Sequence, residues 1–263
     1  KAYVTNWGDG VVDDSNSHVY ATSGVYTVKM YGVIDDFSFN STGDKDKILT
    51  VENWGGLQFV LTNIFDGCLN LLNLSELKNT NENATFQFMF RFCNITNNDF
   101  SNWNTSKVES LYAVFAGNNF NKCIGTGSWD VSSVKSFNRV FNLCPLVNTD
   151  LSNWDTSKGE DFFRMFNRAT SFNQDISNFD FRNAKSISEF MSGKTSADFN
   201  YQYYDNLLIK WDSDPSVGGL DFGKLTNFTT DFGTIQYSSA GAAAHASLVA
   251  KGLIINDGGQ NAF

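Results

Sequence analysis

An apolar anchor recurs along most of this chain at an almost constant spacing. Successive anchors are separated by 25, 25, 26, 25 and 25 residues. They are Phe65, Phe90, Phe115, Phe141, Phe166 and Met191. A second apolar column lies four residues before each anchor, from Leu61 to Ile187. Because so short a unit cannot bury its own apolar face, neighbouring units are expected to stack. The spacing therefore predicts an α/β repeat solenoid, leucine-rich-repeat-like, with six repeats of about 25 residues.

Each repeat is predicted to contain a short amphipathic helix. The apolar positions of one helical face are Val108, Leu111, Val114 and Phe115. Segments 106–109 and 157–160 carry Ser three residues before Glu, the spacing of a capping box at a helix N-terminus. Because helices are wider than the distance between neighbouring strands, a stack with helices on one side is expected to curve and to present a concave surface.

Three further columns recur between the anchors. The aromatic column is Trp103, Trp129, Trp154 and Phe179. We expect it to be core, because such rings bury large areas, and a sugar-stacking platform is the alternative. The next column is Asn104, Asp130, Asp155 and Asp180. Its side chains are expected to accept backbone N–H groups in Asx turns, with a bridging cation as the alternative. The polar column just before the aromatic one is Asn102, Ser128, Asn153 and Asn178.

The chain divides into three predicted parts. Residues 1–32 form an N-terminal β cap, residues 33–194 the repeats, and residues 195–263 a C-terminal capping module. In the last part, Tyr204–Trp211 and Ala240–Ala250 are predicted helices, and Leu253–Ile255 a short strand. Terminal units of a repeat protein are expected to be atypical because they cover the ends of the stack.

Composition and motifs argue against several classes of protein. The net charge of −9 and the pI near 4.6 lack the basic footprint of a nucleic-acid binder. No apolar run is long enough for membrane insertion. No zinc spacing, phosphate loop or nucleophile motif is present, so we expect no enzyme activity, no metal and no cofactor.

The cysteines fall into the repeat pattern as well. They are Cys68, Cys93, Cys123 and Cys144. Three of them lie three residues after an anchor, as small buried residues of one column would. Free thiols are therefore expected, and a Cys68–Cys93 bridge between adjacent repeats is the alternative.

Two resemblances to known families follow from these motifs. Residues 6–10, 18–20 and 24–32 carry Trp-Gly-Asp-Gly, His-x-Tyr and Gly-x-Tyr-x-Val, so this segment resembles the end of a PKD-type β-sandwich domain. The run 165–177 and the segments 129–134 and 154–157 resemble the BspA-like leucine-rich-repeat surface proteins, including their mycoplasma-type repeat domain. Departures are Phe179 and Phe181 in place of Trp and Thr or Val, and Arg182 in place of the capping Ser.

The BspA-like resemblance implies an extracellular, cell-surface or virion location and a role in adhesion or host attachment, without any shared site residues. We therefore expect a non-enzymatic binding module that recognises a cell-surface glycan or protein. The polar column Asn102, Ser128, Asn153 and Asn178 is the predicted contact surface, with solvated strand positions as the alternative. The second hypothesis is a structural subunit of a capsid, fibre or surface layer that assembles with itself or with other virion or surface subunits.

Overall fold

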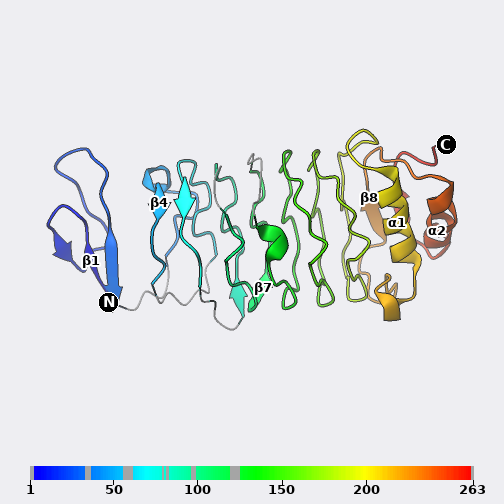
Figure 1. Cartoon of the computed structure of the whole chain (residues 1–263), viewed down its shortest axis with the longest axis horizontal. Coiled ribbons are helices and arrows are strands. Elements are labelled where there is room, and N and C mark those ends of the chain that lie inside the picture. The colour runs from blue at the N-terminus through cyan, green and yellow to red at the C-terminus, as the bar shows by residue number, and fades with distance from the viewer. Residues whose placement is uncertain are drawn as a thin grey trace.

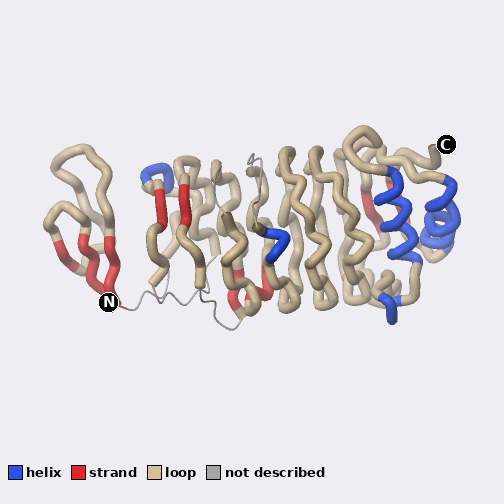
Figure 2. Tube along the Cα trace, viewed as in Figure 1, coloured by secondary structure: helices blue, strands red, loops and turns tan. Residues whose placement is uncertain are grey.

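The computed structural model describes residues 3–32, 37–55, 62–78, 80, 83–95, 99–118 and 125–261. The molecule is elongated, with the repeats lying side by side along its long axis (Figure 1). A small antiparallel sheet lies at the N-terminal end, and two helices lie at the C-terminal end. Most of the backbone between these ends consists of turns and loops (Figure 2).

Regular elements are short and belong to separate sheets. The N-terminal sheet has the order β2-β1-β3 and joins β1 (Tyr3–Asn6), β2 (Val12–Asp13) and β3 (Lys29–Gly32). The repeats contain the parallel pairs β4 (Thr50–Val51) with β5 (Asn73–Leu74) and β6 (Ala84–Thr85) with β7 (Val108–Ser110), and the 3₁₀ turns η1 (Lys45–Lys47) and η2 (Thr126–Ser128). The C-terminal part contains α1 (Tyr201–Asp212), η3 (Pro215–Val217), β8 (Thr229–Asp231), α2 (Ser239–Ala250) and β9 (Ile254–Asn256), with β8 parallel to β9.

The prediction of an α/β repeat solenoid is wrong. Both α-helices of the described chain lie after the last repeat, and its strands form separate sheets of two or three strands. The segments predicted as helices are successive turns, because each contains two residues with positive φ, four positions apart. These pairs are Asn63 and Gly67, Phe88 and Phe92, Ala113 and Gly117, Arg139 and Leu143, Arg164 and Arg168, and Glu189 and Gly193. A left-handed residue costs roughly 1–2 kcal/mol and interrupts a right-handed helix. The expected helix caps and helix-driven curvature are therefore absent from the described repeats.

Backbone hydrogen bonds explain why the turns are stable without helices. Phe162 N donates to Ser186 O at 2.9 Å, and Phe166 N donates to Phe190 O at 2.9 Å. Each of these bonds joins one repeat to the next. Single parallel bridges between successive repeats continue the same pairing at Ser110, Ser136, Asp161 and Ser186. Buried backbone groups must be paired, and here the neighbouring repeat supplies the partner.

The anchors form a buried stack of rings. Phe65, Phe90, Phe115, Phe141 and Phe166 are all fully buried, and Met191 continues the column. The centroids of neighbouring rings are 5.9, 5.9, 6.0 and 5.8 Å apart, within the range of stacked aromatic pairs. Trp103, Trp129, Trp154 and Phe179 are also buried beside this stack, where the core interpretation places them.

The cysteine column links neighbouring repeats. Cys93 Sγ donates to Phe65 O, and Asn118, which holds the same position one repeat later, donates from Nδ2 to Phe90 O at 2.7 Å. Cys68, Cys93 and Cys144 are free thiols, as expected, and Cys123 lies outside the described residues. Burial raises the pKa of the Cys144 thiol to about 12, so this thiol stays protonated and unreactive at neutral pH.

The last position of this column is a buried lysine. Lys194 Nζ donates to Ala169 O at 2.7 Å and to Phe172 O at 2.8 Å. Burial lowers the pKa of Lys194 to about 8. The side chain binds carbonyl groups of the preceding repeat, at the point where the C-terminal module begins.

The predicted C-terminal elements are confirmed. Helices α1 and α2 cover the predicted segments, and β9 overlaps the predicted strand. The two helices contact each other, and the buried carboxylate of Asp205 in α1 accepts hydrogen bonds from the N–H and Oγ of Ser238, the N-cap of α2. At the other end, β1 and β2 pair antiparallel and form a hairpin with Asp9 and Gly10 in the connection.

Candidate functional site

The predicted polar column is exposed, but half of it is used within the fold. Asn102, Ser128, Asn153 and Asn178 are all exposed. Ser128 Oγ shares its proton between Gly125 O of its own repeat, at 2.7 Å, and Ser101 O of the preceding one, at 3.1 Å. Asn178 Nδ2 donates to Ser152 O at 2.6 Å. Both of these side chains therefore join their own repeat to the preceding one. Only Asn102 and Asn153 keep amides without a hydrogen bond to the described residues.

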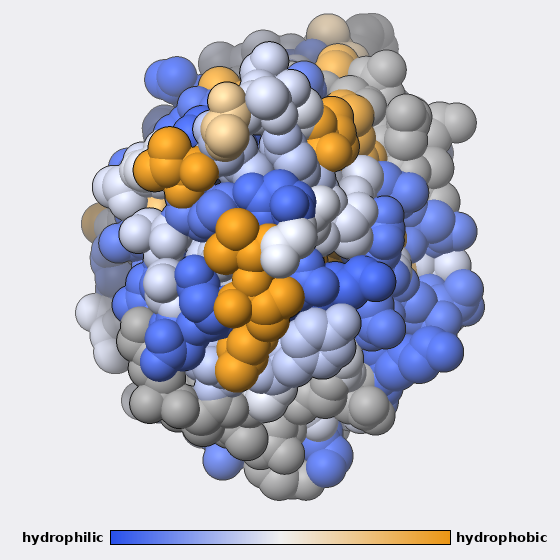
Figure 3. All heavy atoms as spheres, turned by 90° about the vertical axis from the view of Figure 1, so that its left-hand side faces the viewer, coloured by the Kyte–Doolittle hydropathy of each residue, from blue (hydrophilic) through white to orange (hydrophobic). Residues whose placement is uncertain are grey.

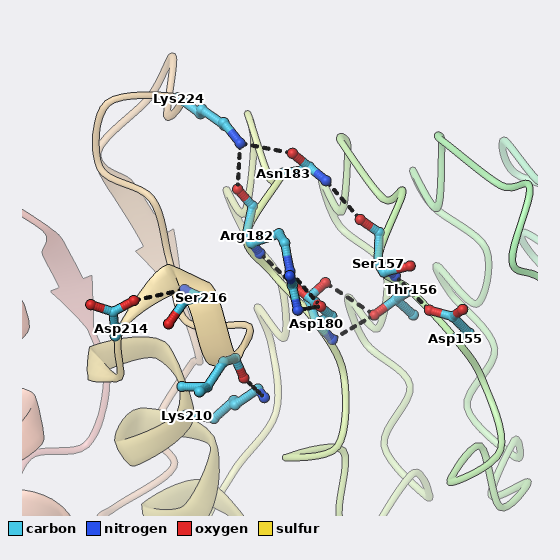
Figure 4. Close-up of polar contacts among 11 residues, drawn as sticks. Asp155, Thr156, Ser157, Asp180, Arg182, Asn183, Lys210, Asp214, Ser216 and Lys224 are labelled. Carbon is cyan, nitrogen blue, oxygen red and sulfur yellow. Dashed lines mark hydrogen bonds and ion pairs between the residues drawn. The ribbon is translucent and has the colours of Figure 1, made fainter.

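The acidic column forms Asx turns, as predicted. Asp155 Oδ1 accepts from Ser157 N at 3.0 Å, and Asp180 Oδ1 accepts from Arg182 N at 3.0 Å (Figure 4). In the same way, Asp130 Oδ1 accepts from Ser132 N, and Asn104 Oδ1 accepts from Ser106 N. Among the described residues, no group of three or more His, Cys, Asp or Glu side chains is placed to hold a metal ion. Figure 4 also shows Thr156 joining the two repeats through Asp180.

These turns should make the fold sensitive to acid. The Ser157 hydroxyl and N–H lower the pKa of Asp155, and the Ser101 groups do the same for Asp99. Because the unfolded carboxyl binds its proton at a higher pH, stability should be fully present above about pH 4 and fall as pH drops further. Asp155→Asn keeps the acceptor, as Asn104 does, so it should lose less stability than wild type between pH 5 and 3 in urea titrations. An identical pH profile for both proteins would contradict this assignment.

A second surface combines arginine and aromatic side chains. We call it the Arg–aromatic strip, and it consists of Phe88, Arg91, Tyr112, Arg139, Phe163 and Arg164, all half-buried. The rings of Phe88 and Tyr112 meet edge to face at 4.7 Å between centroids. The Arg139 guanidinium lies 5.8 Å from the Tyr112 ring centroid and 4.6 Å from that of Phe163. The strip therefore runs without a break across four successive repeats.

Ion pairs from neighbouring repeats hold both ends of the strip. Arg91 forms two hydrogen bonds to the fully buried carboxylate of Asp66, at 2.9 and 2.6 Å. Arg164 binds Glu189 in the same two-bond manner, at 2.8 and 2.7 Å. Such fork-like pairs fix the guanidinium plane as well as its charge. In the middle, Arg139 Nη1 donates to the hydroxyl of Tyr112 at 3.1 Å.

The strip could not be recognised in the sequence because its members belong to different repeat columns. Phe88 and Arg139 lie two residues before an anchor, Tyr112 and Phe163 three residues before, and Arg91 one residue after. Only the paired left-handed turns bring these columns to one face. The signal that was available is glycine at Gly67, Gly117 and Gly193, which repeats at the second left-handed position and disfavours a helix.

Taken together, the chain is a turn-rich repeat protein with an ordered Arg–aromatic surface. Residues 84–204 match a family described as Mycoplasma protein of unknown function, DUF285, which is associated with BspA-like repeat proteins. The matched segment contains the whole strip. It does not include residues 1–32, so their resemblance to a PKD-type domain stays a prediction. Searches of curated proteins and of solved structures gave no match. No helix among the described residues has the length and apolar character needed to cross a bilayer.

Proposed function

We propose that this protein is a non-enzymatic binding module that acts in adhesion on a bacterial cell surface or a virion fibre. Its ligand is a cell-surface glycan or protein, and the Arg–aromatic strip is the contact surface. The single observation that carries the proposal is the continuous contact of Tyr112, Arg139 and Phe163. The match to a family associated with repeat surface proteins supports the location.

The strip has the composition and rigidity of a binding surface. Tyrosine and arginine are enriched among residues that dominate binding energy. Tyrosine offers a large contact area with few rotatable bonds, and arginine offers a planar guanidinium with several N–H donors. Here ion pairs and ring contacts already fix their conformations, so little side-chain entropy would be lost on binding. The half-buried rings keep part of their surface accessible to a partner.

The proposal is tested by the binding of labelled protein to candidate host cells. Tyr112→Ala and Phe163→Ala are each expected to weaken saturable binding at least tenfold, as hot-spot truncations do. Asn153→Ala is the matched control, because Asn153 is exposed and lies outside the strip. Unchanged binding by both strip variants, with loss in Asn153→Ala, would move the contact surface to the polar column.

A second candidate function, subunit assembly, is favoured by the N-terminal sheet. All residues of β3 are exposed, and the sheet presents Val4, Val12 and Met30 to solvent with exposed fractions of 43%, 56% and 37%. Figure 3 shows apolar groups gathered on this end of the molecule. Open sheet edges accept a further strand from a partner. Light scattering that gives a defined oligomer in the wild type and a monomer in Val12→Lys would support assembly, whereas a monomeric wild type would contradict it.

A further inference from the structure

We infer that a hollow beside Phe92 is a subsite for one neutral sugar ring. This inference rests on the proposed binding function, because it names the class of ligand. The hollow measures about 460 Å³ and is lined by Leu69, Asn70, Phe92, Cys93, Asn94 and Gly117. Phe92 joins it to the Arg–aromatic strip, since the Arg91 guanidinium lies over both the Phe88 and the Phe92 rings.

Phe92 occupies a left-handed position at which both flanking repeats carry glycine. The second left-handed position is glycine in three repeats, at Gly67, Gly117 and Gly193, where no side chain opposes a positive φ. The other three repeats place Phe92, Leu143 and Arg168 there. Phe92 adopts the same conformation, with φ of 54°, although glycine would satisfy the fold. Phe92 is nonetheless 48% exposed, so burial offsets only part of the backbone strain. Leu143 shares this strain and is also partly exposed, so what sets Phe92 apart is its place in the lining of the hollow. A strained, exposed aromatic ring beside a hollow points to a role for the side chain outside the fold.

The neighbouring residue positions the ring as a platform. A Cβ added to Gly117 would lie 2.3 Å from Cδ1 and from Cε1 of Phe92. The Phe92 ring therefore rests directly against the backbone of Gly117, and any larger residue there would displace it. Phe92 N also donates to Ala116 O at 2.9 Å, which ties the backbone to the next repeat. The ring is consequently held in place before any ligand arrives.

The lining matches the chemistry of a neutral sugar. None of the six lining residues carries a formal charge at neutral pH. The exposed ring and Leu69 offer apolar surface for the C–H face of a sugar. Asn94 is exposed, and its amide makes no hydrogen bond to the described residues. The Asn70 amide is oriented by its hydrogen bond from Nδ2 to Asp46 O at 2.7 Å. Amides donate and accept, as sugar hydroxyls do.

The test uses the full chain and a panel of glucose, galactose, N-acetylglucosamine and the corresponding uronic acids. Binding is followed by saturation-transfer NMR, and dissociation constants by titration. Phe92→Gly removes the ring and also relieves the backbone strain, so its melting temperature should equal or exceed that of wild type. Its affinity for the neutral sugar that binds should fall at least tenfold, and Asn94→Ala should weaken the same interaction. Leu143→Gly is the matched control, since Leu143 has the same positive φ and lies outside the hollow, and it should bind as wild type does.

Three results would overturn the inference. They are no binding of any neutral sugar, binding of uronic acids alone, and equal sugar affinity in Phe92→Gly and wild type. The same variant separates the two proposals in the cell assay. If Phe92→Gly binds cells normally while Phe163→Ala does not, the adhesion function stands and the sugar subsite is wrong. If wild type binds no cell type, the adhesion function fails, whatever the sugar titration gives.

Discussion

Phe115→Ala is expected to lower the free energy of unfolding by about 3–5 kcal/mol, the usual cost of removing a buried phenylalanine ring. Phe115 is fully buried near the middle of the anchor stack, with ring centroids 5.9 Å from Phe90 and 6.0 Å from Phe141. Its loss would leave a cavity between two repeats that have no helix of their own to keep them folded. Urea unfolding followed by circular dichroism measures the effect.

The control for this prediction is Phe228→Ala. Phe228 is 38% exposed and lies outside the anchor stack, so its truncation should cost much less. A small loss in Phe115→Ala, equal to that of Phe228→Ala, would mean that the stacked rings do not hold the repeats together. If Phe115→Ala lowers both the urea midpoint and the dependence of the unfolding free energy on urea concentration, the repeats before and after Phe115 unfold separately.

Arg91→Met should destabilise the protein by about 3–5 kcal/mol, because it leaves a buried carboxylate without its partner. Asp66 is fully buried, and Arg91 donates two hydrogen bonds to its carboxylate. Truncating one member of a buried pair strands the charge of the other in a poorly solvated site. The melting temperature and the urea midpoint should both fall.

Two further variants make this prediction specific. Lys135→Met breaks a similar contact between repeats, to Glu109 at 2.8 Å. The Lys135 and Glu109 side chains are 52% and 35% exposed, so neither charge is stranded out of water and the cost should stay below about 1 kcal/mol. Asp66→Asn combined with Arg91→Met removes the stranded charge and should recover part of the lost stability. Equal effects of Arg91→Met and Lys135→Met would show that burial of Asp66 does not govern the contact.

The periodic part of the fold could be predicted because every repeat needs the same buried residues. The anchor and tryptophan columns and the Asx turns at Asp130 and Asp155 follow from spacing alone. The helices were predicted wrongly because spacings of three and four residues also suit consecutive turns. At Arg164 and Arg168 the backbone becomes left-handed although neither residue is glycine, so the sequence of this repeat alone does not reveal the turn. Glu109 and Glu160, predicted as helix caps, instead bind lysines of the next repeat.

The candidate site was less accessible to sequence reasoning than the core. The anchor column is phenylalanine in all but its last member, whereas a binding surface departs from the repeat. Phe92 at a position shared with Gly67 and Gly117 is such a departure, but its meaning depends on knowing the sign of φ. The polar column was chosen because it is periodic, and Ser128 and Asn178 show that periodic polar residues can serve the backbone of the preceding repeat.

Hydrogen bonding from each repeat to the next has a consequence for how such a gene can change. In the anchor segments, the internal units donate equivalent N–H groups to their successors and accept from their predecessors at equivalent carbonyl groups. Duplication or deletion of one whole unit would therefore leave equivalent partners in register. The anchor rings are 5.8–6.0 Å apart. Recombination within the coding sequence could therefore adjust the reach of the molecule in steps of about 6 Å per copied unit, without any new fold having to evolve.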